Sequence, residues 1–192
     1  MNTFIRTQLR PAIAILALLT LITGFIYPAV VTGIAQVAFP SQANGSLVMV
    51  NGQAVGSSLI GQSFDDPKYF WGRPSAAGKG YDGTSSGGSN LGPTSKALID
   101  RIAASVDQMR AANGGGPVPV DLVTTSGSGL DPDISPAAAE YQVARVAAAR
   151  GMTVDAVRAA VARHTDGSFL GFIGEPTVHV LALNLDLDGL LR

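Results

Sequence analysis

The sequence predicts an α+β protein in which a single N-terminal transmembrane helix is followed by one mixed α/β extracytoplasmic domain. No charged residue occurs between Arg10 and Asp65, and the stretch from Pro11 to Phe39 within this gap is almost entirely apolar. The rest of the chain combines a hairpin signal, helical periodicity and an alternating, strand-like pattern. With 192 residues, the chain has room for one domain besides the helix.

The apolar stretch is long enough to cross a bilayer. Residues 12–31 supply the approximately 20 uncharged helical residues that a hydrocarbon core about 30 Å thick requires. We therefore expect a cytoplasmic N-terminus at 1–10, a transmembrane helix at 11–35 and an extracytoplasmic domain at 36–192. Arg6 and Arg10 flank only one end, which places that end in the cytoplasm. A cleaved signal peptide and the buried core helix of a soluble protein are the alternatives.

Small residues recur at a four-residue spacing within this segment. Thr20 with Gly24, and Ala29 with Gly33, would let a second helix approach closely in lipid. These four residues are the candidate membrane-anchor contacts, although small residues are common in membrane helices in any case. Pro28 is expected to kink the helix or end its regular part, because it lacks a backbone donor.

The segment after the helix predicts a β-hairpin and then a long loop. Leu47–Val50 and Gln53–Val55 flank Asn51-Gly52, a dipeptide that readily forms a type I′ turn. Residues 65–93 are rich in Gly and Pro and show no periodicity, which indicates a loop. Four aromatic residues in this loop favour an ordered conformation; they are Tyr69, Phe70, Trp71 and Tyr81.

Three helices and two strands are expected in the remaining chain. The helices begin after Ser95, Ser135 and Thr153 as capping residues, and the first two end at Gly114 and Gly151. His164 would cap the end of the third helix. Val118–Thr124 is expected as a short strand. Leu181–Leu187 alternates apolar and polar residues, which predicts a half-buried strand with His179 at its start.

Composition and motifs argue against several functions. With 13 Lys and Arg against 14 Asp and Glu, the net charge of −1 gives no reason to expect a nucleic-acid partner. The absence of cysteine excludes thiolate metal sites, and no metal site is expected from the acidic residues either. Ser126 and Ser128 do not form the G-x-S-x-G elbow of a serine hydrolase, so catalytic residues are not expected, and a membrane-anchored hydrolase remains only an alternative.

Several motifs, in order along the chain, resemble the KdpC family, the C subunits of bacterial Kdp potassium-transporting P-type ATPases. They are Leu59-Ile-Gly-Gln62, Arg73-Pro-Ser-Ala76, Ser86-Gly-Gly-Ser-Asn-Leu-Gly-Pro-Thr-Ser95, Asp121-Leu-Val-Thr124, Ser126-Gly-Ser-Gly-Leu-Asp-Pro132, Ile134-Ser-Pro136, Gln142, Arg145-Val-Ala147, Ala149-Arg150 and Asn184-Leu185. The resemblance covers essentially the whole chain. His179 departs from the family pattern, which has Asn there, and this leaves a polar role at position 179 in question.

The resemblance implies an accessory subunit of an inner-membrane potassium import complex, with its main domain periplasmic. Its partners would be a channel-like potassium-binding subunit, a P-type ATP-hydrolysing subunit and a small membrane peptide, besides membrane lipid. The chain would have no cofactor of its own, would serve assembly, and would raise the ATP affinity of the hydrolysing subunit as a catalytic chaperone, with the outer domain bracing the channel-like subunit.

An alternative within the same family is a nucleotide-binding regulator that shares ATP with the hydrolysing subunit in a ternary complex. The candidate nucleotide-binding residues are Gln142 and Arg145, one helical turn apart, with the loop residues Ser86, Gly87, Gly88 and Ser89.

Overall fold

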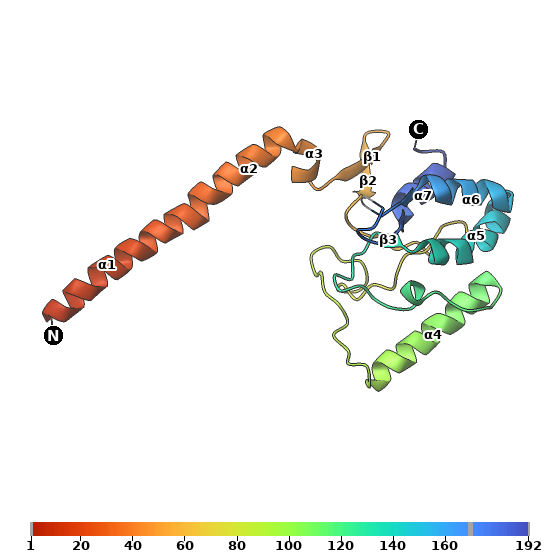
Figure 1. Ribbon diagram of the computed structural model, residues 1–192, viewed down its shortest axis with the longest axis horizontal. Helices are drawn as coiled ribbons and strands as arrows, with labels where there is room; N and C mark the ends of the chain where they lie inside the picture. The colour runs from red at the N-terminus through yellow and green to blue at the C-terminus, as the bar shows by residue number, and fades with distance from the viewer. Residues whose placement is uncertain (1, 169–170, 192) are drawn as a thin grey trace. The chain divides into compact units, whose positions relative to one another are not determined.

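The computed structural model describes residues 2–168 and 171–191. The chain divides into two compact units, one ending at Ser46 and the other beginning at Leu47, and each is described by itself. The first is helical, and the second mixes helices with short strands (Figure 1). The predicted α+β class is thus confirmed.

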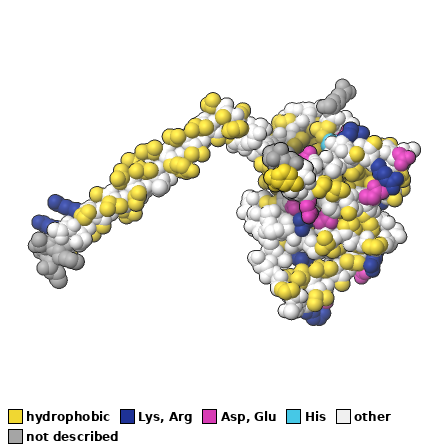
Figure 2. Space-filling model, in the orientation of Figure 1, with side chains coloured by type: hydrophobic (Ala, Val, Ile, Leu, Met, Phe, Trp, Pro, Cys, Tyr) yellow, Lys and Arg dark blue, Asp and Glu magenta, His cyan; other side chains and the backbone are white. Residues whose placement is uncertain are grey.

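The first unit is a long apolar helix. It comprises α1 (Asn2–Leu21), the π-helical turn η1 (Ile22–Ile26), α2 (Tyr27–Ala38) and the short α3 (Pro40–Ala43). The stretch Ile5–Ala38 has a mean hydropathy of 2.3 and is not buried against other parts of the chain. It is long and apolar enough to cross a membrane, which fits a single-pass membrane subunit. Hydrophobic side chains cover it along its length, with Lys and Arg only near its N-terminal end (Figure 2).

The exposure of this helix is inconsistent with the core helix of a soluble protein. Pro28 predicts a distortion of the helix, and the α-helical geometry is indeed interrupted near it. The π turn η1 ends at Ile26, two residues before the proline. Pro28 cannot donate to a carbonyl one turn back, and a π turn accommodates the freed carbonyls. The Thr23 hydroxyl donates to the Leu19 carbonyl at 2.7 Å. The helix therefore continues past Pro28 instead of ending there.

The second unit begins with the predicted hairpin. Strands β1 (Leu47–Val50) and β2 (Gln53–Ser57) pair antiparallel. Asn51 and Gly52 both have positive φ, 50° and 79°, as a type I′ turn requires. The hairpin prediction is therefore confirmed.

Five helices and a second, three-stranded sheet make up the rest of the unit. The helices are α4 (Lys96–Asn113), η2 (Val120–Leu122, 3₁₀), α5 (Pro136–Arg150), α6 (Val154–Arg163) and α7 (Val180–Leu187). The strands are β3 (Asp133–Ile134), β4 (Thr165–Asp166) and β5 (Thr177–His179), in the antiparallel order β3-β5-β4.

The predicted helix ends are confirmed in position, although the Ser95 side chain makes no capping hydrogen bond at the start of α4. The side chains of Ser135 and Thr153 accept hydrogen bonds from the amides of Ala138 and Ala156, which caps α5 and α6. Gly114 and Gly151 take left-handed φ values of 83° and 65° after α4 and α5, a conformation that costs glycine little.

Both predicted strands after residue 117 are wrong. Residues 118–124 contain the 3₁₀ turn η2, and the Asp121 carboxylate beside it accepts from the Ser135 amide at 2.7 Å. Leu181–Leu187 lies in helix α7, in which Leu181, Leu183 and Leu185 are all buried. A helix buried on several sides produces apolar residues at almost any spacing, so the alternation did not identify a strand.

His179 is the last residue of β5 and caps α7, and is not the first residue of a strand as predicted. Its Nδ1 accepts from the Ala182 amide at 3.2 Å, and its Nε2 lies 2.7 Å from the Ser58 carbonyl oxygen. An imidazole thus fills the role of a capping residue, and position 179 keeps a polar function. His164 lies at the end of α6, as expected, and contacts Asp186 of α7 at 3.0 Å.

The core lies between α5, α6, α7 and the three-stranded sheet, and it includes one residue of the long loop. Phe70 is fully buried among Val143, Val146 and Leu183 and the other members of this cluster. The loop is therefore ordered, as its aromatic residues predict.

The loop that contains Gly129 packs against the long loop at 65–93. The Gly129 carbonyl accepts from the Ser75 hydroxyl at 2.6 Å, and the adjacent Ser128 carbonyl accepts from the Gly87 amide at 2.8 Å. A Cβ atom on Gly129 would lie 2.5 Å from the Gly87 carbonyl oxygen, and its φ is 67°. Only glycine fits this crossing.

Replacing Gly129 by alanine is expected to lower the free energy of unfolding by about 2–4 kcal/mol, because of the left-handed backbone and the steric overlap. Gly127→Ala is the matched control, since a Cβ there meets nothing within 4 Å, and it should cost less than about 0.5 kcal/mol. Denaturant unfolding of the detergent-solubilised chain, followed by the fluorescence of its single tryptophan, measures both. Equal stabilities would contradict this packing.

Candidate functional site

Two buried carboxamide side chains hold the loop at Phe70 and Trp71. Asn184 of α7 accepts from the Phe70 amide at 2.8 Å and donates to the Phe70 carbonyl at 2.9 Å. Gln142 of α5 accepts from the Trp71 amide at 2.8 Å and donates to the Trp71 carbonyl at 3.1 Å. Each carboxamide replaces the neighbouring strand that a buried extended segment would otherwise need. We call these four residues the carboxamide clamp.

Arg145 extends the clamp from the same helix. Its guanidinium donates to the carbonyls of Pro67 and Tyr69, to Asn113 at 2.9 Å and to the Gln142 side-chain oxygen at 2.7 Å. It also lies 4.0 Å from the centre of the Trp71 ring, in cation–π geometry. Burial lowers the pKa of Arg145 to about 10, so the group remains charged at neutral pH.

Arg150 holds the other end of the same loop segment. It donates to the carbonyls of Lys68 and Leu187, both at 2.7 Å, and forms a salt bridge of 2.8 Å with Asp188. The Tyr69 hydroxyl donates to the same carboxylate at 2.9 Å. The loop from Pro67 to Trp71 is therefore held by side chains of α5, by Asn184 of α7 and by Asp188, which follows α7.

The predicted nucleotide-binding residues lie in two separate hydrogen-bond networks. Gln142 and Arg145 bond to the clamp, whereas Ser86 and Gly87 bond to the Ser128 carbonyl. Among the described residues, no hydrogen bond joins the two groups. Gln142 is fully buried, and both atoms of its carboxamide are occupied by the fold.

The serines of the alternative hydrolase hypothesis, Ser126 and Ser128, make no hydrogen bond to a histidine among the described residues. Ser126 and Ser128 face each other at 3.3 Å between their hydroxyl oxygens and accept from the amides of Gly129 and Leu130. The imidazoles of His164 and His179 instead contact the Asp186 carboxylate and the Ser58 carbonyl. These contacts support capping and turn roles.

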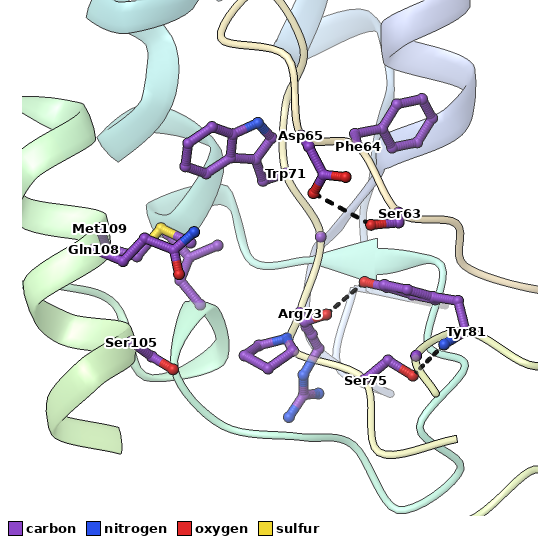
Figure 3. A pocket seen from close by; sticks show the side chains of 14 residues that line it. Ser63, Phe64, Asp65, Trp71, Arg73, Ser75, Tyr81, Ser105, Gln108 and Met109 are labelled. Atoms are coloured by element: carbon purple, nitrogen blue, oxygen red, sulfur yellow. Dashed lines mark hydrogen bonds between the residues drawn. The ribbon is translucent and has the colours of Figure 1, made fainter. Parts of the chain in front are cut away.

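A surface cavity of about 300 Å³ opens beside the clamp. Trp71, Arg73 and Tyr81 line it from the loop, and Gln108 and Met109 face it from α4 (Figure 3). The Tyr81 hydroxyl donates to the Arg73 carbonyl. Burial raises the pKa of Tyr81 to about 12, and the charge of nearby Asp131 acts in the same direction. Tyr81 is thus a neutral hydrogen-bond donor at physiological pH and not a base.

A second cavity, of about 330 Å³, is lined by several acidic residues. Asp131 pairs with Arg73 at 2.9 Å, and Asp121 accepts from the Ser135 amide. Burial raises the pKa of Asp133. Across residues 2–168 and 171–191, no group of three or more His, Cys, Asp or Glu side chains is placed to hold a metal ion.

The small-residue pairs lie on the exposed surface of the N-terminal helix. Gly33 has no atom within 4 Å of an added Cβ, and Gly24 meets only Thr20 of its own helix. On a regular α-helix, Thr20 and Ala29, the first members of the two pairs, would be about 180° apart around the axis. The single π turn between Thr20 and Ala29 adds one residue, which reduces this angle to about 80°. The two pairs thus come nearer to one side of the helix.

Sequence reasoning missed Asn184 as part of the clamp, and Arg150 and Tyr69 as residues that fasten the adjoining loop segment. A signal existed for Asn184, which is the one uncharged polar side chain within the apolar run from Val180 to Leu185. A buried amide needs partners, so its position indicated a hydrogen-bonding role. The partners themselves are more than 100 residues away, which the sequence does not reveal.

Replacing Gln142 by leucine is expected to lower the free energy of unfolding by about 2–4 kcal/mol, since the Trp71 amide and carbonyl lose their buried partner. Gln108→Leu, at an exposed glutamine of α4, is the control and should change stability by less than about 0.5 kcal/mol. Denaturant unfolding followed by far-UV circular dichroism compares them. A loss below about 1 kcal/mol for Gln142→Leu would contradict the clamp.

Comparison with known proteins identifies the family. Residues 9–189 match the family model described as KdpC, the c chain of the K⁺-transporting ATPase. A Potassium-transporting ATPase KdpC subunit from Sorangium cellulosum is 62% identical over 185 residues, covering 95% of this chain and 97% of its own. One from Polaromonas naphthalenivorans is 57% identical (95% and 94% covered), and one from Koribacter versatilis 55% (88% of each). The chain belongs to the KdpC family of potassium-transporting ATPase subunits.

Proposed function

We propose that this chain is a non-catalytic accessory subunit that serves assembly of the Kdp complex and braces its channel-like subunit with the outer domain. The observation that carries this proposal is how the polar side chains of the clamp and of Arg145 are used. Gln142, Asn184 and Arg145 form hydrogen bonds with the backbone of the chain's own loop. Such a network supports a rigid body that presents a surface, and it leaves few polar groups for chemistry.

The proposed partners are the channel-like potassium-binding subunit, the P-type ATP-hydrolysing subunit and the small membrane peptide. The exposed apolar helix supports association within the membrane, because its surface needs either lipid or other helices. We further propose that the subunit raises the ATP affinity of the hydrolysing subunit through the assembled complex. A coupling free energy of about 1–3 kcal/mol between binding of this subunit and binding of ATP would be sufficient for this effect.

The proposed orientation has residues 1–10 in the cytoplasm and the outer domain in the periplasm. Arg6 and Arg10 precede the apolar helix, and the next charged residue after it is Asp65. This asymmetry supports the orientation through the positive-inside bias. It also separates the outer domain from cytoplasmic ATP, which favours an indirect effect on nucleotide affinity.

The alternative is a nucleotide-binding regulator that shares ATP with the hydrolysing subunit. Its supporting observation is Arg145, a charged group stacked on Trp71 near the surface cavity. In this case Gln142, Arg145 and the loop Ser86–Ser89 would contact ATP, and part of the clamp would have to open.

Orientation is tested with single cysteines, because the natural chain has none. In intact spheroplasts, a membrane-impermeant maleimide is expected to label Lys79→Cys without lysis and Gln8→Cys only after lysis, since both positions are exposed. Labelling of Gln8→Cys before lysis, with Lys79→Cys protected, would overturn the proposed orientation.

A test of nucleotide binding distinguishes the accessory subunit from the nucleotide-binding regulator. Adding the chain to the other Kdp subunits in lipid should lower the KM for ATP by about fivefold or more, while azido-ATP photolabels the hydrolysing subunit alone. Ser89→Ala, at a half-buried site of the candidate loop, should leave this KM unchanged. Photolabelling of this chain that Arg145→Lys or Ser89→Ala abolishes would support the alternative instead.

A further inference from the structure

We propose that the β1–β2 hairpin rests in the lipid headgroup layer of the membrane. The contacting surface would be the hairpin patch, which we define as Leu47, Met49 and Leu59. This inference rests on the proposed membrane location of the helix, and it assigns lipid, instead of a protein subunit, as the partner of this surface.

The hairpin patch is unusually exposed for aliphatic side chains. Leu47, Met49 and Leu59 are 54%, 55% and 62% exposed. Leu47 and Met49 alternate with Val48 along β1, so they project from the same face of the strand. Leu59 lies two residues after the end of β2, and its neighbour Ile60 bridges back to Ser57. Adjoining exposed apolar side chains of this kind mark a surface that meets another apolar phase.

The charge pattern favours lipid contact. The uncharged region does not end with the helix at Ala38 but continues through the whole hairpin to Asp65. A membrane span requires only about 20 uncharged residues, so the remaining uncharged residues are not explained by the span. Their composition allows the hairpin to enter the interface without desolvating an ionised side chain.

Chain geometry keeps the hairpin close to the bilayer. From Arg10 to Ala38 a helix rises about 42 Å, which matches the 40–45 Å of a bilayer with its headgroups. Eight residues separate Ala38 from Leu47, and four of them form α3. A helical turn of about 5 Å and six extended Cα–Cα steps of about 20 Å limit the separation of Ala38 and Leu47 to about 25 Å. The patch can therefore reach the headgroup layer.

The composition of the patch also favours lipid over a protein partner. Binding hot spots between proteins are dominated by Trp, Tyr and Arg, and leucine is under-represented among them. The hairpin patch has only aliphatic and thioether side chains, which partition into a membrane interface through burial of apolar area.

The experiment uses the full-length chain in phosphatidylcholine–phosphatidylglycerol vesicles, with an NBD fluorophore on single cysteines. Met49→Cys and Leu47→Cys test the patch, and Leu16→Cys within α1 reports insertion of the helix. Val120→Cys is the matched control, because Val120 is an aliphatic residue that is 70% exposed but lies on η2.

We expect NBD at positions 47 and 49 to show blue-shifted emission and quenching by headgroup-proximal doxyl lipid, while position 120 shows neither. Quenching at position 16 but not at 47 or 49 would overturn the hairpin proposal and leave the membrane location intact. Absence of quenching at position 16 would overturn the membrane location itself. Shielding of position 49 only after the other Kdp subunits are added would assign the patch to a protein partner and overturn the lipid proposal.

Discussion

The fold of the second unit depends on the pairing of two buried carboxamides with two consecutive peptide groups. An extended segment without strand neighbours cannot enter a core, because each buried N–H and C=O without a partner costs about 1–3 kcal/mol. Asn184 and Gln142 supply these partners at Phe70 and Trp71. The Phe70 side chain can therefore be fully buried although it belongs to a loop.

The same pairing determines how the helices are arranged. Gln142 lies on α5 and Asn184 on α7, so a single loop segment joins two helices that are distant in the sequence. Arg145 and Arg150 extend the fastening to the carbonyls of the preceding residues. A domain with three short strands in its main sheet obtains much of its order from these side chains. This construction suits a subunit whose surface, more than any reactive group, serves its complex.

The sequence was informative where structure is determined locally. The hairpin at Asn51-Gly52 and the caps at Ser135, Thr153 and Gly151 depend on residues within one turn of each other, and all were predicted correctly. Helix α7 was not, because its alternation of leucines reflects burial on several sides, which arises only in the packed domain. The clamp could not be predicted for the same reason, as Asn184 and Phe70 are 114 residues apart. Gln142 and Arg145 were singled out only as candidate nucleotide-binding residues, and their contacts within the fold were not foreseen; the orientation of the helix and a nucleotide role stay predictions.

The π turn in the membrane helix has a consequence for how this subunit tolerates sequence change. One residue in Ile22–Ile26 is surplus to an α-helical repeat. Deleting it would leave the length and the apolar character of the span nearly unaltered, and hydropathy alone would judge such a variant silent. The deletion would nevertheless turn Ala29 and Gly33 by about 100° relative to Thr20. The π turn thus sets the angle around the axis between the N-terminal and C-terminal halves of the helix. An insertion or deletion here rotates one half relative to the other.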